Sequence, residues 1–159
     1  MKINILFTFI LSWLLFSISK EDIKTMLISE NKLRMLAVFG ILYLLSLGLS
    51  NNKINIIDLI VNNFSAMFMI FILMYLISYI SYKLLGINSL GMGDIKLSSI
   101  SSIWLGIELS FTSLCISFLL SAIYSLHGKI TKKFKTYHQY PFAPFLSLGI
   151  VCSWILDKI

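Results

Sequence analysis

Charged residues are scarce in this chain of 159 amino acids. They make up 13% of the sequence, whereas hydrophobic residues make up 58%. In soluble globular domains about a quarter of the residues are charged, and a soluble domain of this length could not bury so much apolar surface in one core. The composition therefore excludes an ordinary soluble domain and indicates a membrane protein, in which lipid covers the surplus.

Cysteine is almost absent too. The two cysteines, Cys115 and Cys152, lie in separate apolar runs and form no CxxC pair. The two histidines, His127 and His138, lack metal-ligand spacing with them. We interpret both cysteines as small buried hydrophobic residues, and we expect neither a disulfide framework nor a zinc site.

Several catalytic and binding signatures are also missing. The sequence contains no HExxH zinc-protease motif and no GxSxG nucleophile motif. It contains no glycine-rich phosphate loop, and its basic residues do not alternate with aromatic ones as in nucleic-acid modules. The net charge of +6 therefore does not indicate a nucleic-acid partner. Zinc-dependent and serine-dependent proteolysis are excluded on the same patterns.

Long apolar runs dominate what is present. The run 97–126 carries one charge, Glu108, and as a single helix it would be about 45 Å long. Because the hydrocarbon core is only about 30 Å thick, we expect a break at Gly106. The first run also resembles a secretory signal, but basic residues follow it closely, so we favour an uncleaved span. Six spans are then predicted: 3–19, 33–49, 56–82, 91–106, 109–126 and 141–156.

The distribution of basic residues supports six spans. With six, ten of the thirteen lysines and arginines lie on one side of the membrane: Lys20, Lys24, Lys32, Arg34, Lys83, Lys96, Lys129, Lys132, Lys133 and Lys135. With five, the division is seven against six. Basic residues collect on the cytoplasmic side. We therefore predict an all-α, polytopic membrane helix bundle of about six transmembrane helices, forming one domain over residues 1–159, with both termini outside.

Two aspartates fall on the predicted cytoplasmic face. Asp22 follows the first span and Asp94 precedes the fourth. Glu21 and Glu30 share this side, and we interpret them as solvated loop charges. The opposite face receives Asp58, Glu108 and Asp157.

Asp94 lies in the segment Gly91-Met92-Gly93-Asp94-Ile95-Lys96-Leu97, at the edge of an apolar run. An aspartate there can be an N-cap of a helix, but a carboxylate at such a position is costly and is often functional. Gly91 and Gly93 favour the functional interpretation, because glycine permits close approach of the backbone or a positive φ. Either property would help an extended substrate lie beside the carboxylate.

A pair of aspartates can hydrolyse an amide without a metal ion. One carboxylate accepts a proton from water while the other, protonated, polarises the scissile carbonyl. Such a pair titrates as a unit, so neither role is assigned to Asp22 or Asp94 individually. The sequence therefore predicts an aspartyl protease with these two residues as its catalytic pair.

Lys24 and Lys96 each follow one of these aspartates by two positions. One interpretation is that their ammonium groups reach lipid phosphates at the membrane surface. The other is that they support the site, by binding an acidic residue of a substrate or by lowering the pKa of an aspartate. The first is favoured for Lys24, and both stay open for Lys96.

Three motifs, in order, resemble those of the type IV prepilin peptidases, also called type IV leader peptidases. Residues 91–97 are similar to the family signature GxGDxKL, and residues 22–28 resemble the segment around its first catalytic aspartate. Residues 140–146, Tyr-Pro-Phe-Ala-Pro-Phe-Leu, resemble its PFGPFLA-type motif. The resemblance implies cleavage of basic leaders from prepilins or pseudopilins at the cytoplasmic face of the bacterial inner membrane.

The chain departs from the family pattern in three ways. Ser29 stands where proline is common, and Ala143 stands where glycine is usual. The N-terminal zinc-binding domain with two CxxC pairs, found in long members, is not in this sequence. We expect a short form whose peptidase activity needs no cofactor, with S-adenosylmethionine used only if N-methyltransferase activity is retained. The expected partners are prepilin substrates and membrane lipids, without nucleic acid; the oligomeric state is open.

Three other functions would also place charged residues in a bundle of apolar helices. A transporter or channel would place its charges near the middle of the membrane, whereas Asp22 and Asp94 are predicted at one face. A catalytically inactive subunit of a pilus or secretion assembly would explain Ser29 and Ala143 as drift. Another GxGD protease, such as a preflagellin peptidase, would act on a different substrate.

Overall fold

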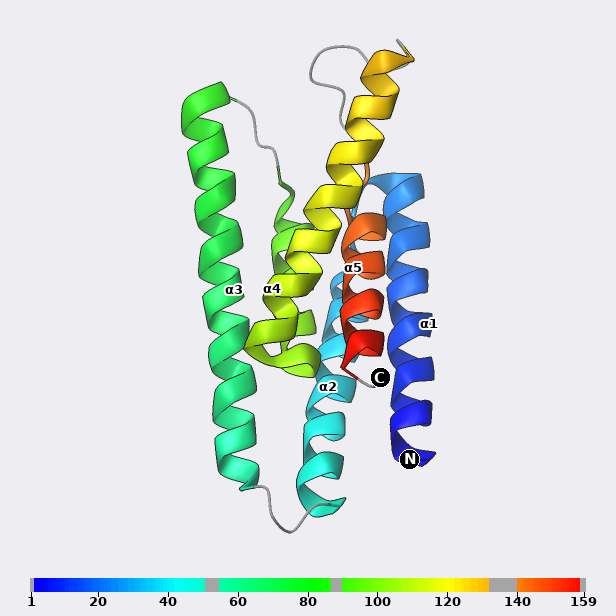
Figure 1. Ribbon diagram of the computed structural model, residues 1–159, viewed down its shortest axis with the longest axis vertical. Helices are drawn as coiled ribbons and strands as arrows, with labels where there is room; N and C mark the ends of the chain where they lie inside the picture. The colour runs from blue at the N-terminus through cyan, green and yellow to red at the C-terminus, as the bar shows by residue number, and fades with distance from the viewer. Residues whose placement is uncertain (1, 51–54, 87–89, 132–139, 158–159) are drawn as a thin grey trace.

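The protein is a bundle of helices. The computed structural model describes residues 2–50, 55–86, 90–131 and 140–157, and these contain helices without any strand. The helices are α1 (Lys2–Thr25), α2 (Glu30–Ser50), α3 (Ile56–Leu85), α4 (Met92–Ile130) and α5 (Ala143–Leu156) (Figure 1). The prediction of an all-α membrane bundle is confirmed.

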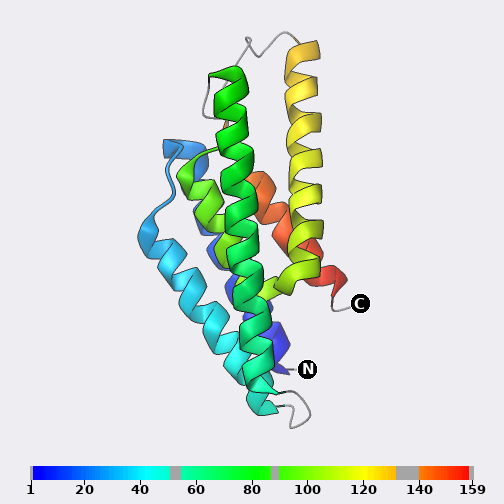
Figure 2. The same cartoon turned by 90° about the vertical axis from the view of Figure 1, so that its left-hand side faces the viewer.

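Helix α4 is broken in the middle. Gly106 has φ 73° and ψ −175°, a left-handed φ that glycine adopts at little cost. The chain reverses its direction there, as Figures 1 and 2 show. The side-chain amide of Asn63, on α3, donates to the backbone carbonyl of Ile103 at 2.8 Å, in the last turn before the break. The predicted interruption at Gly106 is therefore present, and the described residues form six helical segments.

Three stretches within the described residues are long and apolar enough to cross a bilayer: Glu30–Leu49, Ile56–Leu84 and Met92–Ile130. Helix α5 is apolar but has only 14 residues. At 1.5 Å per residue it is about 21 Å long, less than the roughly 30 Å of a hydrocarbon core. The chain is thus a membrane protein whose helices differ considerably in length.

Apolar side chains cover much of the outer surface. Phe68 is 63% exposed on α3, and Cys115 on α4 and Cys152 on α5 are exposed as well. The prediction that both cysteines are buried was wrong. In a membrane protein the outer surface faces lipid, which accepts a thiol or an aromatic ring without the cost that water would impose.

Aromatic rings fill the core between the helices. Tyr43 stacks on Trp104 with ring centroids 5.6 Å apart, and Trp154 meets Trp104 edge to face at 5.9 Å. Each indole N–H has an acceptor: Trp104 donates to the carbonyl of Leu36 at 3.0 Å, and Trp154 donates to the hydroxyl of Thr8 at 2.8 Å. These contacts join α1, α2, α4 and α5 into one core.

Helix α5 lies very close to the second half of α4. A Cβ atom added at Gly149 would lie 2.2 Å from Oγ of Ser117 and 2.4 Å from the carbonyl oxygen of Ser113. Real Cβ contacts do not come so close, so glycine is required for the two backbones to pack at this distance. This contact sets the position of α5 and therefore of its first residue, Ala143.

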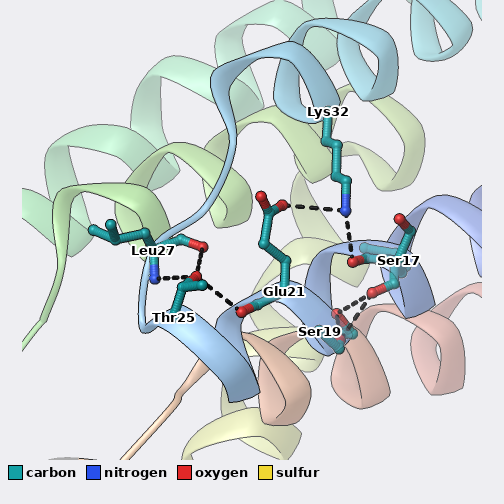
Figure 3. Close-up of polar contacts among 8 residues, drawn as sticks. Ser17, Ser19, Glu21, Thr25, Leu27 and Lys32 are labelled. Atoms are coloured by element: carbon teal, nitrogen blue, oxygen red, sulfur yellow. Dashed lines mark hydrogen bonds and ion pairs between the residues drawn. The ribbon is translucent and has the colours of Figure 1, made fainter.

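The junction of α1 and α2 is held by polar contacts (Figure 3). Nζ of Lys32 donates to the carbonyl of Ser17 at 2.9 Å and lies 3.1 Å from Oε2 of Glu21. Thr25 Oγ1 donates to the carbonyl of Glu21 at 3.0 Å. Glu21 therefore lies on α1 and pairs with Lys32, so its interpretation as a solvated loop charge was wrong. Its neighbour in sequence, Asp22, is held on the same turn.

The turn after α1 contains a strained residue, Met26, with φ 53°. A left-handed φ costs a residue other than glycine roughly 1–2 kcal/mol, whereas glycine loses about 0.5–1 kcal/mol through extra freedom in the unfolded chain. We expect Met26→Gly to raise the free energy of unfolding by up to about 1.5 kcal/mol, measured by thermal unfolding in detergent. Leu27→Gly is the control, because Leu27 is 72% exposed and is not among the residues of positive φ. Equal destabilisation by Met26→Gly and Leu27→Gly would contradict the claim that the backbone of Met26 is strained.

Candidate active site

Asp22 and Asp94 line the same cavity, which has a volume of about 270 Å³. The cavity lies where the end of α1, the turn into α2 and the start of α4 meet. Its walls include Met26, Leu27, Ile28 and Leu33 from the first two helices and their connection, and Met92 from α4. The two residues that the sequence singled out, 72 positions apart, are thus brought together by the fold.

Asp22 is buried in the last turn of α1, with 5% of its surface exposed. Its Oδ2 accepts a hydrogen bond of 3.1 Å from the backbone N–H of Ala143. Ala143 is the first residue of α5, so this N–H has no partner within its own helix, and the positive helix end favours a carboxylate. Asp22 lies beyond the apolar stretch 3–19. Burial raises its pKa, and the hydrogen bond from Ala143 opposes that rise.

Asp94 lies in the first turn of α4. Gly91 is the N-cap of this helix and makes no side-chain capping bond, so the interpretation of Asp94 as the N-cap was wrong. Oδ1 of Asp94 is buried and has no hydrogen-bond partner among the residues that the structure describes. Buried polar atoms nearly always have a partner. This oxygen of Asp94 is therefore an unpaired buried acceptor in a residue that lines the cavity.

The two glycines before Asp94 allow close packing, but neither has a positive φ. A Cβ atom at Gly93 would lie 3.2 Å from three carbons of the Ile28 side chain, and one at Gly91 would lie 3.3 Å from Oδ2 of Asp94. We expected these glycines to permit either a positive φ or a close approach of the backbone, and the structure shows the close approach. It brings the start of α4 against Ile28 and leaves room around the carboxylate of Asp94.

An ion pair stands at the same cavity. Nζ of Lys96 lies 2.5 Å from Oε1 of Glu30, the first residue of α2, and both residues line the cavity. Their side chains are 44% and 70% exposed, so water screens the pair and its contribution to stability is small. The sequence did not indicate this pairing, because the residues are 66 positions apart. Glu30 is solvated, as predicted, but it lies on α2 and not in a loop.

Lys24 does not line the cavity, and its side chain is exposed. It is two residues from the buried Asp22, and residues two apart lie on different faces of a helix. Of the six residues proposed from the sequence, Lys24 is the one that the fold leaves outside.

A metal centre finds no support among the described residues, where no group of three or more histidine, cysteine, aspartate or glutamate side chains could hold an ion. Two aspartates line the cavity, and a pair of carboxyl groups can activate water and polarise a carbonyl.

Comparison with known proteins identifies the family. The model of the type IV leader peptidase family matches residues 9–126, a range that contains both Asp22 and Asp94. Searches of curated proteins and of solved structures return no match. The family match covers well over half of the sequence, and it agrees with the apolar helices and with the aspartates in one cavity. The chain therefore belongs to the type IV leader peptidase family and is a membrane peptidase.

Proposed function

We propose that the protein is an aspartic endopeptidase that removes the basic leader from type IV prepilins or pseudopilins. The observation that supports this most strongly is the shared cavity of Asp22 and Asp94. Family membership alone supports a leader peptidase in general terms. The two carboxylates in one cavity add support for peptide hydrolysis by a pair of aspartates.

In the proposed reaction, one carboxylate accepts a proton from a water molecule in the cavity as the water oxygen attacks the scissile carbonyl carbon. The other carboxyl group donates its proton to the carbonyl oxygen. The C–N bond then breaks as the first carboxyl group passes its proton to the nitrogen and the second carboxylate takes a proton back from a hydroxyl of the intermediate, so that a new carboxyl group and a new amine are released. Ala143 holds Asp22 in place through its N–H. Asp94 lines the same cavity as Asp22, which supports the two carboxyl groups acting on one water molecule and one carbonyl.

The proposed location is the cytoplasmic face of the bacterial inner membrane. The support is the charge distribution, because the side that carries Asp22 and Asp94 also carries ten of the thirteen basic residues in the six-span arrangement. The peptidase reaction as proposed needs no cofactor. S-adenosylmethionine would be required only for methylation of the new N-terminus.

The test is a cleavage assay with the purified protein in liposomes. The substrate is a peptide in which a short lysine-rich segment precedes an apolar helix, and a matched peptide carries glutamate in place of each lysine. We expect one cut, located by mass spectrometry between the basic segment and the apolar helix, and slower cleavage of the matched peptide. Folded protein that cuts neither peptide would contradict the proposal and favour an inactive assembly subunit.

A further inference from the structure

A second cavity, of about 260 Å³, lies between α3 and the first half of α4. We call it the α3–α4 groove. Figure 2 shows α3 running alongside this part of α4. The groove is lined by Met67, Phe68, Phe71, Lys96, Ser99 and Ile100.

The groove offers an apolar surface. Phe68 and Phe71 are 63% and 38% exposed, and Phe71 stacks on Tyr75 with ring centroids 6.3 Å apart. The hydroxyl of Ser99 donates to the carbonyl of Ile95 at 2.6 Å within α4, so it is already satisfied. An apolar helix could therefore lie in the groove without leaving a polar group unpaired.

The groove adjoins the cavity of Asp22 and Asp94. Lys96 lines both spaces, and its ammonium group is turned to Glu30 on the cavity side. A molecule that fills both must be apolar where it meets Phe68 and Phe71 and polar beyond Lys96. It must also reach from the lipid-facing surface to the two aspartates.

The charges around the aspartate cavity favour a polypeptide over a lipid as the molecule that fills the cavity and the groove. The charged residues lining the aspartate cavity are three acids, Asp22, Glu30 and Asp94, and one base, Lys96. Because Glu30 already pairs with Lys96, a phosphate headgroup would meet an acidic surface. A basic peptide segment next to an apolar helix would meet a complementary one.

We propose that the α3–α4 groove binds the apolar helix of the substrate, which enters the active site sideways from the lipid past Lys96. This inference rests on the proposed function, since it supplies the route by which a membrane-anchored peptide reaches Asp22 and Asp94. Lys96 then forms the boundary between the part of the substrate that stays in the groove and the part that is cut.

Site-specific photo-crosslinking tests the groove. A photoreactive phenylalanine analogue replaces Phe71, or as the control replaces Ile72, which is 54% exposed on the same helix and does not line the groove. The Asp94→Asn protein is used in liposomes with the lysine-rich peptide, so that substrate is not consumed. We expect cross-linked peptide from position 71 only, lost on adding excess unlabelled peptide. Equal cross-linking from both positions, or cross-links from position 71 to lipid alone, would overturn the inference.

A kinetic measurement on the active protein complements the cross-links. Phe68→Ala should raise KM for the peptide with the apolar helix while leaving kcat unchanged, and Ile72→Ala should change neither. An unchanged KM in Phe68→Ala would contradict the proposal that the α3–α4 groove binds the apolar helix of the substrate. Cross-linking needs no cleavage, so a groove that binds peptide in a protein that never cuts it would refute the proposed function and leave the docking surface standing.

Discussion

Asp22→Asn and Asp94→Asn should each lower kcat/KM for peptide cleavage by about 10²–10⁴-fold, the usual contribution of a positioned acid or base. Asparagine preserves the shape of aspartate but can neither accept the proton of water nor donate one to the carbonyl. Both side chains line the cavity, so both losses should appear in kcat. The assay is the liposome cleavage reaction, with the amount of folded membrane protein measured for each variant.

Asp58→Asn is the matched control for both substitutions. Asp58 is an exposed residue in the first turn of α3 and is not among those that line the cavity. Its substitution should leave the cleavage rate unchanged. If Asp22→Asn or Asp94→Asn, present at normal levels, cleaved as fast as Asp58→Asn, that residue would have no catalytic role.

Gly149→Val should have the largest effect on stability. The added carbons of valine would collide with the hydroxyl of Ser117 and with the backbone carbonyl of Ser113. The hydroxyl of Ser117 can rotate away, but the backbone of Ser113 cannot. Overpacking of this kind costs about 1–3 kcal/mol, and sometimes more. Because α5 begins at Ala143, its displacement would also remove the hydrogen bond to Asp22, so cleavage should fall with stability.

Leu148→Val provides the comparison for Gly149→Val. Leu148 is the preceding residue on α5 and is 54% exposed, so valine there meets no neighbouring helix. Thermal unfolding in detergent, followed by circular dichroism, should show a lower midpoint for Gly149→Val than for Leu148→Val. Equal midpoints would mean that α4 and α5 are not packed as closely as the structure places them.

Much of the helical framework could be predicted from the sequence. The runs 33–49 and 56–82 correspond to α2 and α3, because long apolar stretches in lipid satisfy their backbone groups as helices. The length of the run 97–126 predicted the break at Gly106, where glycine tolerates the left-handed φ. The sequence singled out the two aspartates because charges at the ends of apolar runs are costly and few, and the structure brings both to one cavity.

The contacts between distant segments could not be predicted in this way. The bond from Ala143 to Asp22 joins residues 121 positions apart, and no periodicity in the sequence relates them. The pairing of Lys96 with Glu30 likewise depends on how α2 and α4 pack. Helix α1 continues to Thr25, beyond the apolar stretch, and this extension places Glu21 on a helix rather than in a loop. Burial rules for soluble proteins also misplaced Cys115 and Cys152, because lipid is an apolar solvent.

The claim that Asp22 and Asp94 act as one catalytic pair is tested most directly by combining their substitutions. The measurement is kcat/KM of the Asp22→Asn/Asp94→Asn double variant, set beside the two single variants and detected by mass spectrometry of the products. Residues that act as a unit are strongly non-additive, so the double variant should be no slower than the slower single one. A double variant whose loss equals the product of the two single losses would mean that the aspartates contribute independently, and would contradict a shared catalytic site.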